Sequence, residues 1–151
     1  MALTFRGGVH PDDKKELTRK KAFETIPAPA TVVIPMLMHI GQPCQPLVAK
    51  GNKVKLGQKI GESTAPISAP IHSSVSGTVV AVEPRLHPNG NMVMSVVIEN
   101  DFNDTLDESV RPHGSVESLS ADELIRIIRE AGIVGLGGAA FPTHAKIQSG
   151  L

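Results

Sequence analysis

The sequence predicts a mainly β fold over residues 1–115, followed by a shorter segment, residues 116–151, that begins with a helix. Three observations predict this order. Five prolines between residues 26 and 46 exclude a long helix there. Short apolar stretches broken by Gly, Asn or Pro then run from Leu47 to Glu99, which is typical of many short strands joined by turns. Apolar residues at helical spacing follow only after residue 119.

The expected strands are short runs rich in β-branched residues. The first lies between the prolines, and the five are Thr31–Ile34, Lys53–Leu56, Lys59–Gly61, Gly77–Val82 and Met92–Ile98. Several of these runs lack a regular alternation of polar and apolar residues. We therefore expect strands that are buried on both faces or closed into a tight barrel. The polar stretch from Glu99 to Ser118 predicts a linker or long loop with a solvated surface.

One helix is clearly marked in the sequence. Ser120 and Glu123 have the spacing of a capping box, and Gly132 is expected to end the helix. Between them, one apolar stripe is formed by Leu124, Ile127, Ile128 and Ala131. A second helix is expected to start near Thr143. Because too few elements follow Gly114 to close a second core, we expect residues 116–151 to be the truncated start of a further domain in a longer protein.

Composition excludes several functions. The chain has 15 Lys+Arg against 15 Asp+Glu and no Trp or Tyr. It therefore lacks the basic surface and aromatic platforms that bind nucleic acids. No apolar run is long enough to span a membrane and the N-terminus lacks a secretory signal, so we expect an intracellular location. Cys44, the single cysteine, cannot form an internal disulfide or hold an iron–sulfur cluster alone. The six histidines lack the spacing of zinc sites, and no residue is marked as catalytic or metal-binding.

The strongest candidate for a binding site is the segment Gly132–Lys146, GIVGLGGAAFPTHAK. Glycines let a backbone approach a ligand closely and adopt positive φ. Backbone N–H groups ahead of a helix suit a phosphate, and Lys146 adds a positive charge about one turn into the expected helix. The spacing differs from GxGxxG and from GxxxxGK[ST]. The alternative is a glycine-rich turn that packs two helices closely.

This segment resembles the flavin-binding loop of the NADH-oxidising subunit of respiratory complex I, roughly GLRGRGGAGFPTGLKW. It is more similar still to the corresponding loop in the C subunit of the Rnf electron-transport complex. The complex I loop has arginines at the positions of Val134 and Leu136, and its last glycine at the position of Ala140. The resemblance implies that FMN binds at Gly135, Gly137, Gly138, Ala139 and Lys146.

Two further segments support the same family. Phe5–Pro11, FRGGVHP, resembles the FxGGIHP opening of Rnf C subunits, and Pro35–Gly41, PMLMHIG, resembles their PLxQHIG segment, with Met38 where glutamine is usual. The resemblance therefore runs from Phe5 to Lys146. For His10 and His39, which these segments contain, we expect hydrogen-bonded structural roles.

Residues Leu47–Val82 are similar to the hairpins of biotinyl and lipoyl carrier domains, which implies a barrel-sandwich hybrid, a flattened barrel of short strands. Carriers attach their cofactor to a lysine at the tip of an exposed hairpin. The turn expected at that place, Glu62–Ser68, contains no lysine. The resemblance therefore implies the carrier fold without the carrier function.

The resemblance implies the N-terminal part of a subunit in an ion-translocating NADH:ferredoxin oxidoreductase. In this family the subunit is thought to pass electrons from NADH through FMN and iron–sulfur clusters, in exchange with ferredoxin. FMN and NADH would bind to the full-length subunit, the 4Fe-4S clusters would lie beyond residue 151, and neither cofactor is expected on this chain alone. Implied partners are the other subunits and ferredoxin-side acceptors, at the cytoplasmic face of the inner membrane. A non-catalytic docking module and a covalent carrier domain remain the alternatives.

Overall fold

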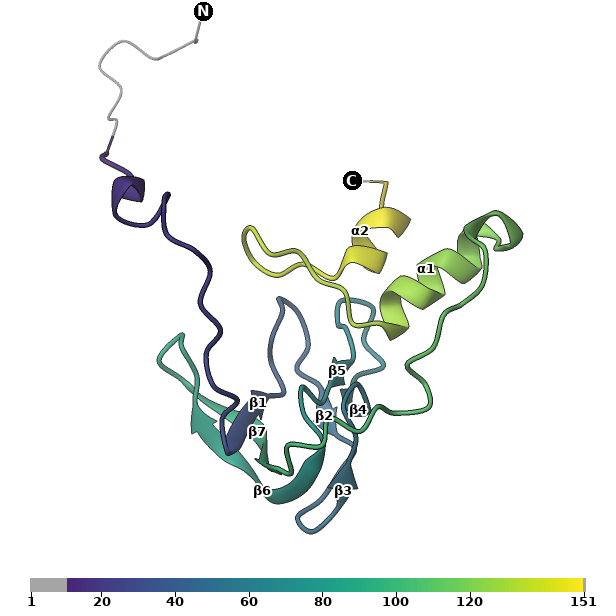
Figure 1. Cartoon of the computed structure of the whole chain (residues 1–151). Helices are drawn as coiled ribbons and strands as arrows, with labels where there is room; N and C mark the ends of the chain where they lie inside the picture. Colours follow the sequence, from purple (N-terminus) through teal and green to yellow (C-terminus); the bar gives the residue numbers. More distant parts are fainter. Residues whose placement is uncertain (1–10, 151) are drawn as a thin grey trace, which may run out of the picture.

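The computed structural model describes residues 11–150, which form two antiparallel sheets and a pair of helices (Figure 1). The first sheet has the strand order β1-β7-β6-β3, and the second has the order β2-β4-β5. The strands are β1 (Thr31–Pro35), β2 (Gln45–Pro46), β3 (Lys53–Val54), β4 (Lys59–Glu62), β5 (Ile71–His72), β6 (Gly77–Leu86) and β7 (Met92–Asn100). The mainly β fold is confirmed, and a strand lies at each of the five expected places, although β3 ends at Val54 instead of Leu56. The short strands β2 and β5 were not expected from the sequence.

The core lies between the two sheets and is built from ten buried residues: Ile34, Met36, Cys44, Val54, Ile60, Ile71, Val75, Val79, Val96 and Ile98. Every strand except the short β2 supplies at least one of them, so neither sheet has a core of its own. In β7 four consecutive residues, Ser95 to Ile98, are buried, which confirms a strand covered on both faces. Burial on both faces explains why the sequence of this strand does not alternate between polar and apolar residues.

The longest hairpin differs in extent from the sequence expectation. The sequence predicts β6 over Gly77–Val82, but the strand continues to Leu86, because each added residue pairs with one of β7 up to Leu86 opposite Met92. A register shift between Val79 and Ala81 bends β6. A strand can extend into polar residues when its partner supplies the backbone hydrogen bonds.

The polar segment after β7 is a loop, as expected, but the barrel holds it in place. The backbone N–H of Leu56 donates to Thr105 O at 2.9 Å, and that of Asp107 donates to Leu56 O at 2.9 Å. The Ser76 hydroxyl donates to Asp101 Oδ1 at 2.6 Å and accepts from the N–H of Thr105 at 3.0 Å. The segment therefore follows the barrel surface closely.

A short 3-10 turn, η2 (Val116–Ser118), follows this loop. Two α-helices come after it, α1 (Ala121–Glu130) and α2 (Thr143–Gln148). The capping box is confirmed, since Glu123 N–H donates to Ser120 Oγ at 3.3 Å and Ser120 N–H donates to Glu123 Oε2 at 2.9 Å. Gly132 ends α1 with φ of 68°. The helices lie together on one side of the barrel (Figure 1).

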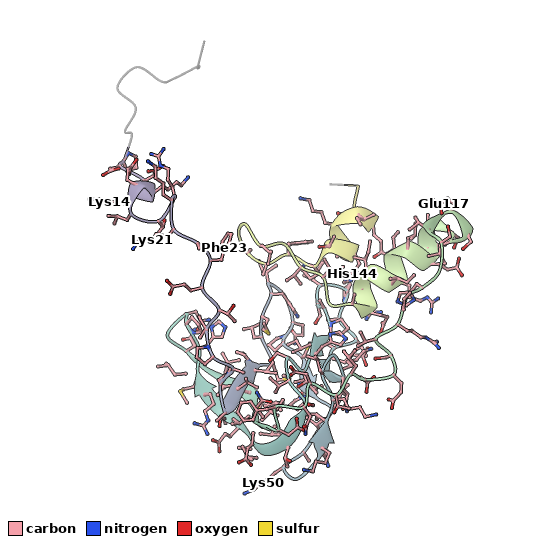
Figure 2. The ribbon with its side chains drawn as sticks, in the orientation of Figure 1. Lys14, Lys21, Phe23, Lys50, Glu117 and His144 are labelled. Carbon is pink, nitrogen blue, oxygen red and sulfur yellow. The ribbon has the colours of Figure 1, made fainter. Side chains whose placement is uncertain are left out.

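Residues 11–30 are exposed throughout and run away from the barrel as an extended arm with one 3-10 turn, η1 (Lys15–Leu17) (Figure 2). Asn100 ties its end to the sheet by donating from Nδ2 to Pro29 O at 3.0 Å. The FRGGVHP segment, with His10, lies outside the described residues apart from Pro11. Within residues 11–150 no helix has the length and apolar character needed to cross a membrane.

Candidate functional site

The glycine-rich segment is a closed loop between α1 and α2. Its base is held by two backbone hydrogen bonds, from Gly135 N–H to Phe141 O at 3.0 Å and from Thr143 N–H to Ile133 O at 3.0 Å. An antiparallel bridge between Val134 and Pro142 joins the two sides. These contacts leave the residues between Gly135 and Phe141 as a projecting tip (Figure 1).

The structure places the predicted site residues on this loop and on the helix after it. Gly135, Gly137, Gly138 and Ala139 are exposed, and Lys146 is exposed on α2. Leu136, at the tip, is 99% exposed. The N–H of Gly135 already donates to Phe141 O, so the loop offers to solvent the backbone around Gly137 and Gly138, beside the cationic side chain of Lys146.

Packing explains only one glycine of this segment. A Cβ on Gly132 would lie 2.4 Å from Pro70 O, whereas a Cβ on Gly137 or Gly138 would meet no atom within 4 Å. Close helix packing is therefore wrong as the reason for the glycines at the tip. The expected positive φ is also wrong for Gly135, Gly137 and Gly138, because positive φ in this loop occurs at Gly132 and Ala140. Glycine at the tip leaves open space where a side chain would otherwise stand.

Ala140 has the strained backbone of the loop, with φ of 50°. The left-handed region costs an L-residue with a Cβ roughly 1–2 kcal/mol. The complex I loop has its last glycine, a residue without a Cβ, at this position. This chain has an alanine there and adopts the left-handed conformation with it.

The barrel anchors the tip of the loop through the segment after β1. Ile40 N–H donates to Ala139 O at 2.9 Å. His39 fixes this segment: its Nδ1 bonds Ile40 O at 3.0 Å, and its Nε2 accepts from the N–H of Ala69 at 3.1 Å. The structural role expected for His39 is confirmed. Because the Ile40 carbonyl can only accept, Nδ1 is the donor in its bond to Ile40 O.

Cys44 belongs to the same buried network. Its thiol donates to Ala69 O at 3.2 Å and lies 3.7 Å from Ser68 Oγ. Burial raises the pKa of the Cys44 thiol, which disfavours the reactive thiolate. We assign Cys44 to packing and hydrogen bonding.

A second link joins α1 to the barrel beside a cleft of about 850 Å³. Lys59 Nζ donates to Glu130 Oε2 at 2.5 Å and to Glu62 Oε1 at 3.1 Å. The hydrogen bond from Lys59 lowers the pKa of Glu130. This ion pair holds the carboxyl end of α1 against β4, where a cation also complements the helix dipole.

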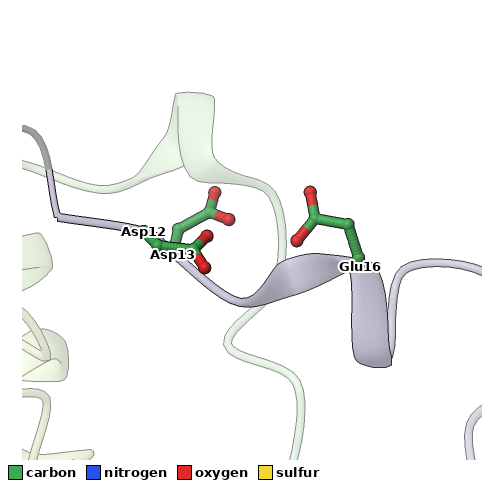
Figure 3. Close-up of side chains that lie close together, drawn as sticks. All are labelled: Asp12, Asp13 and Glu16. Carbon is green, nitrogen blue, oxygen red and sulfur yellow. The ribbon is translucent and has the colours of Figure 1, made fainter.

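Three carboxylates on the arm, Asp12, Asp13 and Glu16, lie close together (Figure 3). Each already has a cationic partner, in the pairs Lys14–Asp12, Lys15–Asp13 and Arg19–Glu16. All three are exposed. We interpret the group as surface ion pairing.

Comparison with known proteins identifies the barrel. A family model described as the RnfC barrel sandwich hybrid domain matches residues 3–103. The chain belongs to the RnfC family. The expected resemblance and the barrel-sandwich hybrid are both confirmed. Because the match ends at residue 103, the glycine-rich loop lies outside it.

Relatives of the RnfC chain extend over the loop as well. The C subunit of the Na(+)-translocating ferredoxin:NAD(+) oxidoreductase complex of Acetobacterium woodii is 51% identical over 144 residues, 95% of this chain and 32% of the relative. The corresponding subunit of the proton-translocating complex of Clostridium ljungdahlii is 47% identical over 147 residues, 97% of this chain and 32% of that protein. Its counterpart in an ion-translocating oxidoreductase complex of Vibrio cholerae is 36% identical, with 97% of this chain and 19% of the relative covered. The chain spans about a third of these curated relatives, or less.

Sequence reasoning located the RnfC loop but missed the residues that hold it. Ile40 carries no chemical signal, because its contribution is a backbone N–H. Lys59 and Glu130 are ordinary surface types in the sequence, and only their pairing distinguishes them. The HIG triplet of the Pro35–Gly41 segment was the available signal, since it carries both His39 and Ile40.

Proposed function

We propose that this chain is the N-terminal part of an RnfC-type subunit that oxidises NADH, and that its glycine-rich loop binds the phosphate of FMN. The observation that carries the proposal is the open tip, where Gly137 and Gly138 have no neighbour that excludes a side chain. A ligand that approaches the backbone closely explains such glycines. The names of the relatives, ferredoxin:NAD(+) oxidoreductase subunits, make a redox cofactor the fitting ligand.

Three residues of the loop and one residue of α2 have a defined task in this proposal. The exposed N–H groups around Gly137 and Gly138 donate to phosphate oxygens, and Lys146 adds one charge-assisted hydrogen bond. The contact of Ala139 with Ile40 holds the loop in one conformation before the ligand arrives. Bound FMN would accept a hydride from NADH and release the two electrons singly. Iron–sulfur clusters and the exchange with ferredoxin belong to parts of the subunit and of the complex beyond this chain.

The barrel is the scaffold of the proposed site and a docking surface for other subunits. It presents Ile40 and Lys59 to the loop and to α1, while its core closes without any residue after residue 100. We infer a peripheral position at the cytoplasmic face of the membrane complex. A carrier role finds no support, because the turn where carriers hold their lysine has none.

Flavin retention in the full-length subunit tests the proposal. Gly138→Val should abolish it, because the side chain enters the space of the phosphate. The chain itself has room for this side chain, and φ at Gly138 is not positive, so the melting temperature should stay unchanged. Asn103→Val, on an exposed loop of the barrel, is the control. Wild-type visible absorbance of flavin in purified Gly138→Val protein would refute the loop assignment.

The 151-residue chain alone should bind FMN weakly, with a dissociation constant above about 1 µM, or roughly −8 kcal/mol. The loop contacts one end of the ligand, and walls for the flavin ring would come from outside the chain. Calorimetric titration of FMN measures this. Tighter binding would show that residues 11–150 already hold a complete pocket. The docking alternative, in contrast, expects no flavin in the full-length subunit either.

A further inference from the structure

A buried histidine lies between the glycine-rich loop and the barrel. His144, on α2, is 4% exposed (Figure 2). The backbone of Pro66, whose carbonyl oxygen can only accept a hydrogen bond, acts on the ring and raises its pKa, against the larger effect of burial. Within residues 11–150, Nδ1 of His144 is the one buried side-chain nitrogen or oxygen that has no hydrogen-bond partner. A proton on Nδ1 would be a buried donor without an acceptor, so we expect the neutral ring to carry its proton on Nε2 and to leave Nδ1 as an unpaired acceptor.

The surroundings of His144 disfavour a positive charge. Among the described residues, the charged or titratable groups that act on the ring are Arg129 of α1 and His39 of the segment after β1. The Pro66 segment contributes its carbonyl alone. Burial, and after it Arg129, lowers the pKa of His144 below its ordinary value of 6.5. His72 differs, because Glu130 and Asp107 partly offset its burial and the charge of Lys59.

We propose that His144 is a pH-sensitive latch, whose neutral ring holds α2 and the glycine-rich loop on the barrel and whose protonation releases them. A proton on Nδ1 would create a buried N–H without an acceptor and a charge near Arg129. Both costs disappear when α2 leaves the barrel and the ring reaches water. The barrel remains folded, because its ten core residues all lie between residues 34 and 98.

The sign of the effect follows from proton linkage. The latched ring binds a proton less readily than the released ring, so the stabilisation is complete above pH 6.5 and is lost as the pH falls below it. One proton taken up on release makes the equilibrium between latched and released loop change about tenfold per pH unit in this range. The contact between Ile40 N–H and Ala139 O should open with the same profile.

Nuclear magnetic resonance on the 151-residue chain tests the latch. We expect the His144 ring to stay neutral at pH 6.5, and the protection factor of the Ile40 amide, corrected for intrinsic exchange, to fall about tenfold per pH unit in acid. Amides of β7 should keep their protection. His144→Gln, which cannot be protonated, should remove the pH dependence, whereas His113→Gln, at an exposed position, should keep it.

Charge offers a second test that does not disturb the buried ring. Arg129→Gln removes the cation near His144, brings the pKa of the latched ring closer to that of the released ring, and should therefore weaken the opening of the loop in acid. The latch is refuted if the Ile40 amide opens with the same pH profile in His144→Gln as in the wild type. It is equally refuted if the loop stays closed down to the pH at which the barrel itself unfolds.

A consequence for FMN rests on the proposed function: the full-length subunit should retain less flavin at pH 5.5 than at pH 7.5, and His144→Gln should reduce this difference. A wild-type subunit that binds no FMN at pH 7.5 would count against the flavin site. The exchange experiment on the chain would still decide the latch.

Discussion

The barrel and the helical region that follows it differ in how their residues are used. The barrel buries ten core side chains between two sheets. Among residues 116–150, only Pro142, His144 and Ala145 are buried, and α1 contains no buried residue. The barrel therefore supplies most of the stability, while the helical region keeps its backbone open to solvent. A loop that must receive a ligand can be exposed in this way because another part of the chain holds it.

The largest effect should come from the core of the barrel. Ile98→Ala removes a side chain with no exposed surface and should lower the free energy of unfolding by about 3 kcal/mol, from lost burial and the remaining cavity. Urea denaturation followed by circular dichroism measures it. Ile147→Ala, a matched change at a 46% exposed position on α2, should cost less than about 0.5 kcal/mol. A similar loss in the free energy of unfolding at both sites would contradict the proposed difference between the barrel and the helical region.

The second-largest effect should come from a substitution at Gly132, where the helical region contacts the barrel. Gly132→Ala places a Cβ 2.4 Å from Pro70 O at a residue with φ of 68°, and should weaken docking of the helices by about 2 kcal/mol. Hydrogen exchange at the end of α1 and at Ile40 should increase, with β7 unchanged. Gly137→Ala is the matched control and should have almost no effect. If β7 also loses protection, the two regions unfold together.

The ion pair between Lys59 and Glu130 should contribute less. Their side chains are 28% and 45% exposed, so water screens the pair and a double-mutant cycle with Lys59→Met and Glu130→Gln should give at most about 1 kcal/mol. Because Lys59 lowers the pKa of Glu130 below 4.5, this stabilisation is present above pH 4.5 and is lost as the pH falls through the lowered value. On lowering the pH, this loss begins below 4.5, whereas that of the His144 latch begins below 6.5. A coupling energy that does not change between pH 7 and pH 3 would contradict this assignment.

The smallest expected effect is a gain in the stability of the loop. Ala140→Gly relieves the cost of a Cβ at φ of 50° and loses part of the gain to the greater freedom of glycine in the unfolded chain. We expect stabilisation of the loop by a few tenths of a kcal/mol, seen as slower exchange of the Gly135 amide. Faster exchange would show that tertiary contacts of the alanine methyl outweigh its backbone strain.

Local chemistry allowed the sequence to determine the elements of this protein. β-branched runs between turn residues marked the five expected strands, and Ser120 with Glu123 marked the start of α1. These features depend on residues at most a few positions apart, so they can be read along the chain. The family, too, was recognisable from the glycine-rich segment and from Pro35–Gly41, because both are continuous in sequence.

Only the tertiary structure decided how the glycine-rich loop is held and why its glycines are there. Ile40 and Ala139 are about a hundred positions apart, so the role of neither is visible from a local pattern. His144 is close to the backbone of Pro66, far away in the sequence, and the space around Gly137 and Gly138 is open because no other atom lies within 4 Å of a Cβ placed there. Contacts between distant residues follow from how the sheets and helices pack, and no short stretch of sequence contains that information.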